Sequence, residues 1–261
     1  MSKKAIVTSI ILISIGIIGM LFMNRLNEQG GFNVQTKTFD ARKIDAIYTQ
    51  LYVSDIEVKQ SKDAFIKVEW LDSIENPIEV NEKDRTIKVS GVKQKKKLVN
   101  LQWNEKERPV RLYLPAKKFK QLEFHTRVGQ IKGENIFAEK ALITTSTGDV
   151  QFKKGEIDNL DIKVQVGDIT LEKIKGNGQF ETKTGNIKYK ETSIKHPLSF
   201  RTKVGNIHIS LEEKPKNVSF ITQTEVGDIQ VFEKKESIHV DGGISVYAKT
   251  ATGDIKIINE R

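Results

Sequence analysis

The second half of the chain repeats one short phrase seven times, and this repeat limits the possible folds more than any other feature. Each copy resembles TRVGQIKG or TSTGDVQF, in which a glycine follows Val or Thr and precedes a polar residue and then Ile or Val. The central glycines are Gly129, Gly148, Gly167, Gly185, Gly205, Gly227 and Gly253. Their spacings of 19, 19, 18, 20, 22 and 26 residues indicate one structural unit per repeat.

Residues around the glycine alternate as in a half-buried strand. The residue three before the glycine is Thr in six copies and Val164 in the seventh, and the residue five before is Phe or Ile in the first five copies. We expect these positions, the Val or Thr directly before the glycine, and the Ile or Val two residues after it to face the core. The glycine is expected to provide a positive φ at a corner, where the Asp or Asn that usually follows it is a common turn residue.

Two all-β architectures fit this pattern. In a parallel β-solenoid each repeat forms one coil of about 20 residues, and like positions stack about 4.8 Å apart. In an antiparallel meander each Gly-Asp pair would form a two-residue hairpin turn. We favour the β-solenoid, because stacked coils need the same residue at every pitch, whereas hairpins need only complementary neighbours.

The region before the repeats also has the pattern of strands. AFIKVEW from Ala64 and VRLYL from Val110 alternate apolar and polar residues, and YVSDIEV from Tyr52 resembles a degenerate repeat in which Ser54 replaces the glycine. We expect residues 32–115 to form an N-terminal β region that caps the open end of a repeat domain at residues 116–261.

The N-terminus carries an uncharged run, AIVTSIILISIGIIGMLFM, at residues 5–23. A helix of this length spans about 28 Å, close to the ~30 Å hydrocarbon core of a bilayer. Lys3 and Lys4 precede it, so the positive-inside rule predicts a cytoplasmic tail of residues 1–4. A cleaved signal peptide is the alternative, but its apolar region is usually shorter. We therefore predict a transmembrane signal anchor, a tether of residues 24–31 and an extracytoplasmic domain.

The apolar N-terminal segment, the YVSDIEV opening, the joint RLYLPAKKFKQLEFHTRVGQIKG and the Gly-Asp-Ile repeats occur together in this chain. In this combination the chain resembles the bacterial putative-adhesin domain family over residues 32–261. That family includes LiaG-like membrane proteins found beside cell-envelope stress systems of Gram-positive bacteria. The resemblance implies an all-β repeat fold and supplies no catalytic residues.

Candidate chemistry at the repeats is limited. Asp149 and Asp168 follow successive glycines and could be neighbours across coils, as in a calcium ladder or in the paired carboxylates of a polysaccharide-cleaving β-helix. Asn186 and Asn206 interrupt that row of charges, and Asx residues are expected at turns anyway. The chain has no cysteine, and its four histidines lack metal-ligand spacing. We expect no catalytic residue, no metal and no cofactor.

Lysine clusters are the feature that points to a partner. They comprise Lys93, Lys95, Lys96, Lys97, Lys117, Lys118 and Lys120. The net charge of +9 could suggest nucleic acid, but an exported domain would not meet it. These lysines are either ordinary solvated surface or a contact for anionic envelope polymers or lipid headgroups.

The sequence therefore predicts a non-enzymatic binding or scaffold protein at the bacterial cell envelope, held by a single membrane pass. A first alternative is an accessory component of a cell-envelope stress response that acts through an envelope protein. A second alternative is a polysaccharide-active β-helix enzyme.

Overall fold

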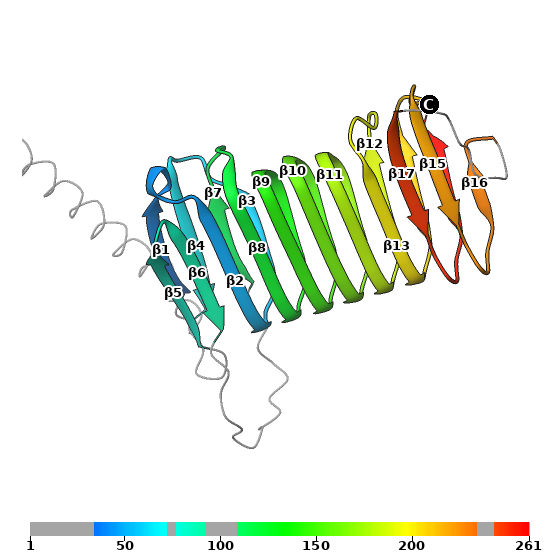
Figure 1. Ribbon diagram of the computed structural model, residues 1–261. Coiled ribbons are helices and arrows are strands. Elements are labelled where there is room, and N and C mark those ends of the chain that lie inside the picture. Colours follow the sequence, from blue (N-terminus) through cyan, green and yellow to red (C-terminus); the bar gives the residue numbers. More distant parts are fainter. Residues whose placement is uncertain (1–33, 72–76, 92–108, 234–242, 261) are drawn as a thin grey trace, which may run out of the picture.

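The computed structural model describes residues 34–71, 77–91, 109–233 and 243–260. These residues form 18 β-strands and one short 3-10 turn, Ala41–Lys43 (Figure 1). The strands are β1 (Val34–Asp40), β2 (Ala46–Val53), β3 (Ile56–Gln60), β4 (Phe65–Leu71), β5 (Ile78–Lys83), β6 (Thr86–Gly91), β7 (Val110–Leu114), β8 (Phe119–Val128), β9 (Ile131–Thr147), β10 (Val150–Val166), β11 (Ile169–Thr184), β12 (Ile187–Glu191), β13 (Leu198–Val204), β14 (Ile207–Leu211), β15 (Val218–Gln223), β16 (Ile229–Val231), β17 (Ile244–Lys249) and β18 (Ile255–Asn259).

The predicted membrane anchor at residues 5–23 lies outside the described residues. Within the described residues, no helix has the length and apolar character needed to cross a membrane.

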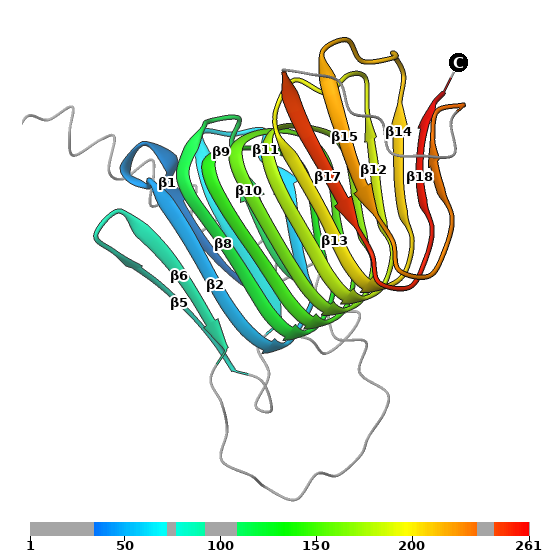
Figure 2. The same cartoon turned by 45° about the vertical axis from the view of Figure 1, so that its right-hand side comes forward.

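The strands stack as flattened coils with two sides, which we call sheet 1 and sheet 2 (Figures 1 and 2). Sheet 1 contains, in spatial order, β6, β2, β8, the second halves of β9, β10 and β11, then β13, β17 and β15. Sheet 2 contains β7, β3, the first halves of β9, β10 and β11, then β12, β14, β18 and β16. All these neighbours pair in parallel. The predicted β-solenoid is thus confirmed, and the repeats are not an antiparallel meander.

Each coil has two different corners. At one corner, strands β9, β10 and β11 bend at a residue in the left-handed region, namely Asn135 (φ 56°), Lys154 (φ 53°) and Lys173 (φ 55°). At the other corner lies the repeat glycine. Between the two sheets the core is a stack of like side chains, because the Ile or Val two residues after each glycine is paired with its counterpart in the neighbouring coil. This part of the predicted inward pattern is confirmed, since Ile131, Val150, Ile169, Ile187, Ile207 and Ile255 are fully buried. In the outermost coil, the corresponding Ile229 is partly buried and packs against the core.

One position predicted to face inward is exposed. Val128, Val166, Val204 and Val226 directly precede a glycine, and their exposure lies between 43% and 64%. The threonine three residues before the glycine is the last inward side chain of the coil. Because the chain starts to turn immediately after that threonine, the alternation stops, and the two residues before the glycine both point outward.

The last two coils stack in the reverse of their order in the chain. Strand β17 pairs with β13 on one side and with β15 on the other, and β18 lies between β14 and β16 in the same way. The coil of β17 and β18 is therefore inserted between the coil of β13 and β14 and the coil of β15 and β16 (Figure 2).

The same reversal occurs at the N-terminal end, where the coil of β2 and β3 lies between the coil of β6 and β7 and that of β8 and β9. Ser54 occupies the glycine position of this inserted coil, because its N–H donates to Val128 O at 3.0 Å as Gly129 N–H does to Thr147 O at 2.9 Å. The degenerate repeat at YVSDIEV is thus confirmed.

The outermost N-terminal strands are antiparallel. Strand β1 pairs with β4, β4 pairs with β7, and β5 pairs with β6. The predicted N-terminal region thus contributes two coils as well as these antiparallel strands. The division at residues 115 and 116 stays a prediction, and both sheets continue across it.

Candidate functional site

The glycine corner has no room for a side chain. All seven repeat glycines have φ between 139° and 150°. A Cβ built on Gly167 would lie 2.2 Å from Gly148 O, and one built on Gly253 would lie 2.1 Å from Gly205 O. The predicted positive φ at this corner is confirmed, and close stacking of successive corners adds a second reason for glycine.

Two hydrogen-bond ladders join neighbouring corners. The buried Thr182 hydroxyl donates to Gly167 O at 3.0 Å, as Thr202 does to Gly185 O at the same distance. Beside this ladder, the Asx side chains accept hydrogen bonds from the backbone of the next coil.

The Asx ladder includes the two carboxylates that sequence analysis placed across coils. The N–H of Asp168 donates to Asp149 Oδ1 at 2.9 Å, and the N–H of Asn186 donates to Asp168 Oδ1 at 2.7 Å. Both carboxylates thus bind backbone. In the part of the chain that the structure describes, no three His, Asp or Glu side chains gather as they would around a metal ion.

The predicted lysine clusters are only partly described, because Lys93, Lys95, Lys96 and Lys97 lie outside the described residues. Lys117 Nζ donates to the carbonyl oxygens of Ala41, at 2.6 Å, and Ile44, and burial lowers the pKa of Lys117. Its contacts therefore hold the N-terminal end of the fold together.

The other two described lysines form ion pairs. Lys118 Nζ lies 2.6 Å from Asp158 Oδ1, and Lys120 Nζ lies 3.0 Å from Asp45 Oδ2. Arg85 also binds Asp45 in a bidentate manner, at 2.8 and 2.9 Å, and the hydrogen bonds from Arg85 and Lys120 hold the pKa of Asp45 well below its usual range. Contact of these lysines with an anionic polymer stays a prediction.

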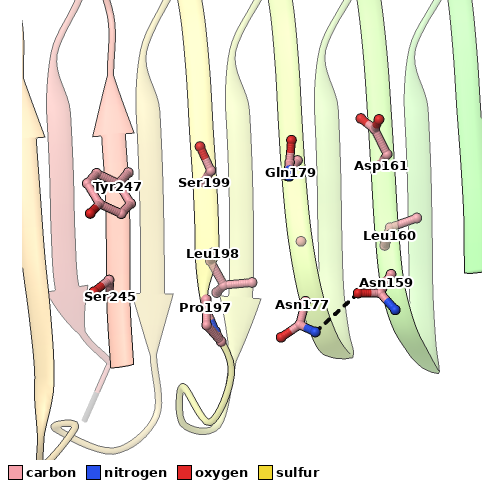
Figure 3. A pocket seen from close by; sticks show the side chains of 11 residues that line it. Asn159, Leu160, Asp161, Asn177, Gln179, Pro197, Leu198, Ser199, Ser245 and Tyr247 are labelled. Carbon is pink, nitrogen blue, oxygen red and sulfur yellow. Dashed lines mark hydrogen bonds between the residues drawn. The ribbon is translucent and has the colours of Figure 1, made fainter. Parts of the chain in front are cut away.

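A shallow pocket of about 260 Å³ hollows the outer side of sheet 1 across β10, β11, β13 and β17 (Figure 3). Its lining residues are Asn159, Leu160, Asp161, Asn177, Gly178, Gln179, Pro197, Leu198, Ser199, Ser245 and Tyr247. The strand register arranges the polar ones in rows across the strands, and one row runs from Asp161 through Gln179 and Ser199 to Tyr247.

The pocket combines an aromatic side chain with groups that form hydrogen bonds. Tyr247 is 48% exposed. Asn177 Nδ2 donates to Asn159 Oδ1 at 3.2 Å, which orients the two amides (Figure 3). Amides, hydroxyls and a carboxylate beside an exposed ring can bind a polar ligand that also has an apolar face.

A row of charged residues borders the pocket on its glycine-corner side. Arg201 and Lys249 follow Ser199 and Tyr247 by two residues on the same strands and are paired with each other in register. Both are exposed, and neither has an ion-pair partner among the described residues. By contrast, Lys163 in the same row is paired with Asp161 at 2.7 Å.

This pocket was not among the sites predicted from the sequence. Its polar residues stand at equivalent outward positions whose residue type differs from coil to coil, so they form no repeated sequence pattern along the chain. One feature of the sequence could have indicated it: the basic residues Arg201 and Lys249 stand at the same place in their repeats, four residues before a corner glycine.

Three solved structures are similar to the chain at low sequence identity. A "putative adhesin" from Bacteroides fragilis has 17% identity and a TM-score of 0.48, over 87% of this chain and 97% of that one. A "putative cell adhesion protein" from Clostridium sporogenes has 14% identity and a TM-score of 0.45, over 88% of this chain and 100% of that one. A "putative lipid binding protein" from Parabacteroides distasonis has 15% identity and a TM-score of 0.43, over 87% and 98%.

No curated protein matches the sequence. The Toastrack family, DUF4097, matches residues 117–261, which comprise more than half of the chain and all seven repeat glycines. The chain therefore belongs to the Toastrack family.

Proposed function

We propose that the chain is a membrane-anchored, extracytoplasmic binding or scaffold protein of the bacterial cell envelope, of the LiaG-like type. The uncharged run at residues 5–23 and the preceding Lys3 and Lys4 support an anchor with a cytoplasmic N-terminus. In this proposal the solenoid is held outside the cell close to the membrane surface.

The binding role is supported by what the side chains contact at the glycine corners and on the outer side of sheet 1. At the corners, the repeated Gly, Thr and Asx residues form the hydrogen bonds and close contacts between coils. By contrast, outward residues of β10, β11, β13 and β17 line a shallow pocket beside two cations that form no ion pair among the described residues. An exposed pocket of this kind is typical of a ligand-binding surface.

A catalytic role for the corner carboxylates is not part of the proposal. Asp149 and Asp168 accept backbone hydrogen bonds from the next coil through Oδ1, so a structural role accounts for both. Replacing either by Asn should leave ligand binding intact, because the amide oxygen of Asn can accept the same hydrogen bond.

The test uses the full-length protein in its own membrane. Protease added to intact cells without their outer wall should digest the domain after residue 31 and leave the extreme N-terminus. The purified full-length protein should then capture a polymer or protein from an envelope extract. Digestion only in permeabilised cells would contradict the topology, and an empty capture would contradict the binding role. Capture of a membrane sensor protein alone would favour the accessory role in envelope stress.

A further inference from the structure

We propose that the pocket on sheet 1 binds a pyranose ring that carries an anionic substituent, as in an acidic polysaccharide. The inference rests on the proposed binding function and names the ligand class for it. It is carried by three features of the outer side of sheet 1: one exposed aromatic ring, a row of hydrogen-bonding groups, and two cations that form no ion pair within the part of the chain that the structure describes.

The aromatic ring belongs to Tyr247 on the inserted strand β17. The row that it shares places Ser199, a small residue, on one side and Ile221 on the other, so the ring is not covered by a large polar side chain. The face of an exposed tyrosine can pack against the C–H groups of a sugar ring while its hydroxyl stays in water. A bare polyanion such as polyphosphate has no such apolar face.

Hydrogen-bonding groups continue the row away from Tyr247. Ser199, Gln179 and Asp161 lie on successive strands, and Figure 3 shows them along one side of the pocket. Parallel strands are about 4.8 Å apart, so the row from Asp161 to Tyr247 is about 14 Å long. This is longer than a single sugar ring. The Ser199 hydroxyl and the Gln179 amide can both donate to and accept from sugar hydroxyls, whereas the Asp161 carboxylate, which also pairs with Lys163, can only accept.

The cations determine the charge of the ligand. Arg201 and Lys249 lie next to the Ser199 and Tyr247 end of the row and form no ion pair among the described residues. The exposed Glu181 is the register neighbour of Arg201 on β11, whereas Lys249 lies on the other side of Arg201, one strand farther from that carboxylate. Lys183 and Lys203 are exposed on β11 and β13 near the same corner, and they too form no ion pair in the described part of the chain. A guanidinium binds a carboxylate or phosphate group through two parallel hydrogen bonds. An anionic substituent on a ring that packs against Tyr247 could therefore reach Arg201 or Lys249.

Three ligands test separately the need for a sugar ring and the need for a negative charge. Polygalacturonate carries both, its methyl ester carries the ring without the charge, and polyphosphate carries the charge without the ring. The full-length protein in lipid nanodiscs should bind polygalacturonate at least about fivefold more tightly than either of the other two, since the loss of one contact worth about 1 kcal/mol lowers affinity by about that factor.

Two variants measure separately how much the aromatic ring and the two cations contribute to polygalacturonate affinity. Tyr247→Ala should reduce polygalacturonate affinity to the level of polyphosphate, and the double variant R201Q/K249Q should reduce it to the level of the methyl ester. Matched controls are Tyr48→Ala, in the same outward row near the N-terminal end, and K132Q/K256Q on sheet 2, which removes the same charge. Both controls should bind like the parent. The two pocket variants and K132Q/K256Q should keep the parent melting temperature because their side chains are exposed, whereas Tyr48→Ala should lower it slightly because the half-buried ring packs against His125.

Equal binding of polyphosphate and polygalacturonate would overturn the inference, because the ring would then contribute nothing. Unchanged binding by both pocket variants would also overturn it, since the ligand would then bind elsewhere. If polygalacturonate is not bound but the envelope capture succeeds, the inference fails while the proposed binding function stands.

Discussion

The backbone N–H of Asp254 donates to Asn206 Oδ1 at 2.8 Å, although 48 residues separate them. In turn, the N–H of Asp228 donates to Asp254 Oδ1 at 2.9 Å. The final repeat of the sequence is therefore the second coil from the end of the stack. This insertion places Tyr247 next to Ser199 and so completes the pocket.

Removal of the inserted coil should disrupt its outer neighbour as well. Within the described residues, β15 forms backbone pairs with β17 alone, and β16 forms them with β18 alone. A chain that ends at residue 243 should therefore lose hydrogen-exchange protection throughout β15 and β16, while β9 and β10 keep theirs. Retained protection in β15 would contradict the insertion and favour stacking in chain order.

The sequence could not predict this order. Each repeat presents the same Thr, Gly and Ile to its neighbours, so either order of the last two coils buries the same kinds of side chain. The spacings before Gly227 and Gly253, of 22 and 26 residues, are longer than the others, and they were the only sign in the sequence that the last two coils stack in reverse order. Likewise the regular pattern predicted the corner and the core, but it could not show that Val166 turns outward at the corner, because alternation breaks only where the backbone bends.

The corner glycine should be far less tolerant of substitution than the residue after it. Gly167→Val should destabilise the protein by about 3 kcal/mol or more, because a β-branched side chain would be strained at φ 148° and would clash with Gly148 O. Asp168→Asn should change the free energy of unfolding by less than about 0.5 kcal/mol, since Asn can still accept from Asn186 N–H. Urea unfolding of both variants provides the comparison, and equal losses would count against the structural role of the Asx ladder.

The threonine ladder offers a matched pair. Thr182→Val removes the hydrogen bond to Gly167 O in a buried site and should cost about 1 kcal/mol. Val164 stands at the same position in the preceding coil, beside Gly148 O. Val164→Thr adds a hydroxyl there and should cost less than about 0.5 kcal/mol because the new donor can find that acceptor. Chemical denaturation measures both, and a larger loss for Val164→Thr would show that the hydroxyl is not what joins the coils.

The ion pairs of Asp45 should make stability depend on pH only in acid. Arg85 and Lys120 depress the pKa of Asp45 in the folded protein, so the stabilisation is complete above its ordinary pKa of about 4 and is lost as the pH falls toward the folded value. The melting temperature of the parent should therefore exceed that of Asp45→Asn by a constant amount from pH 7 to about pH 5, and by less below about pH 4. A gap that stays constant down to pH 2 would mean that the carboxylate charge contributes nothing.

We infer that sheet 1 is the side of the solenoid that binds an envelope ligand, and lysine acetylation of the full-length protein can test this claim. Three exposed lysines on each sheet, none with an ion pair among the described residues, provide the comparison: Lys183, Lys203 and Lys249 near the pocket on sheet 1, and Lys132, Lys188 and Lys256 on sheet 2. Addition of envelope extract should slow acetylation of the sheet 1 lysines, Lys249 most of all, and leave the sheet 2 lysines unchanged. Protection confined to sheet 2, or equal on both sheets, would contradict the claim.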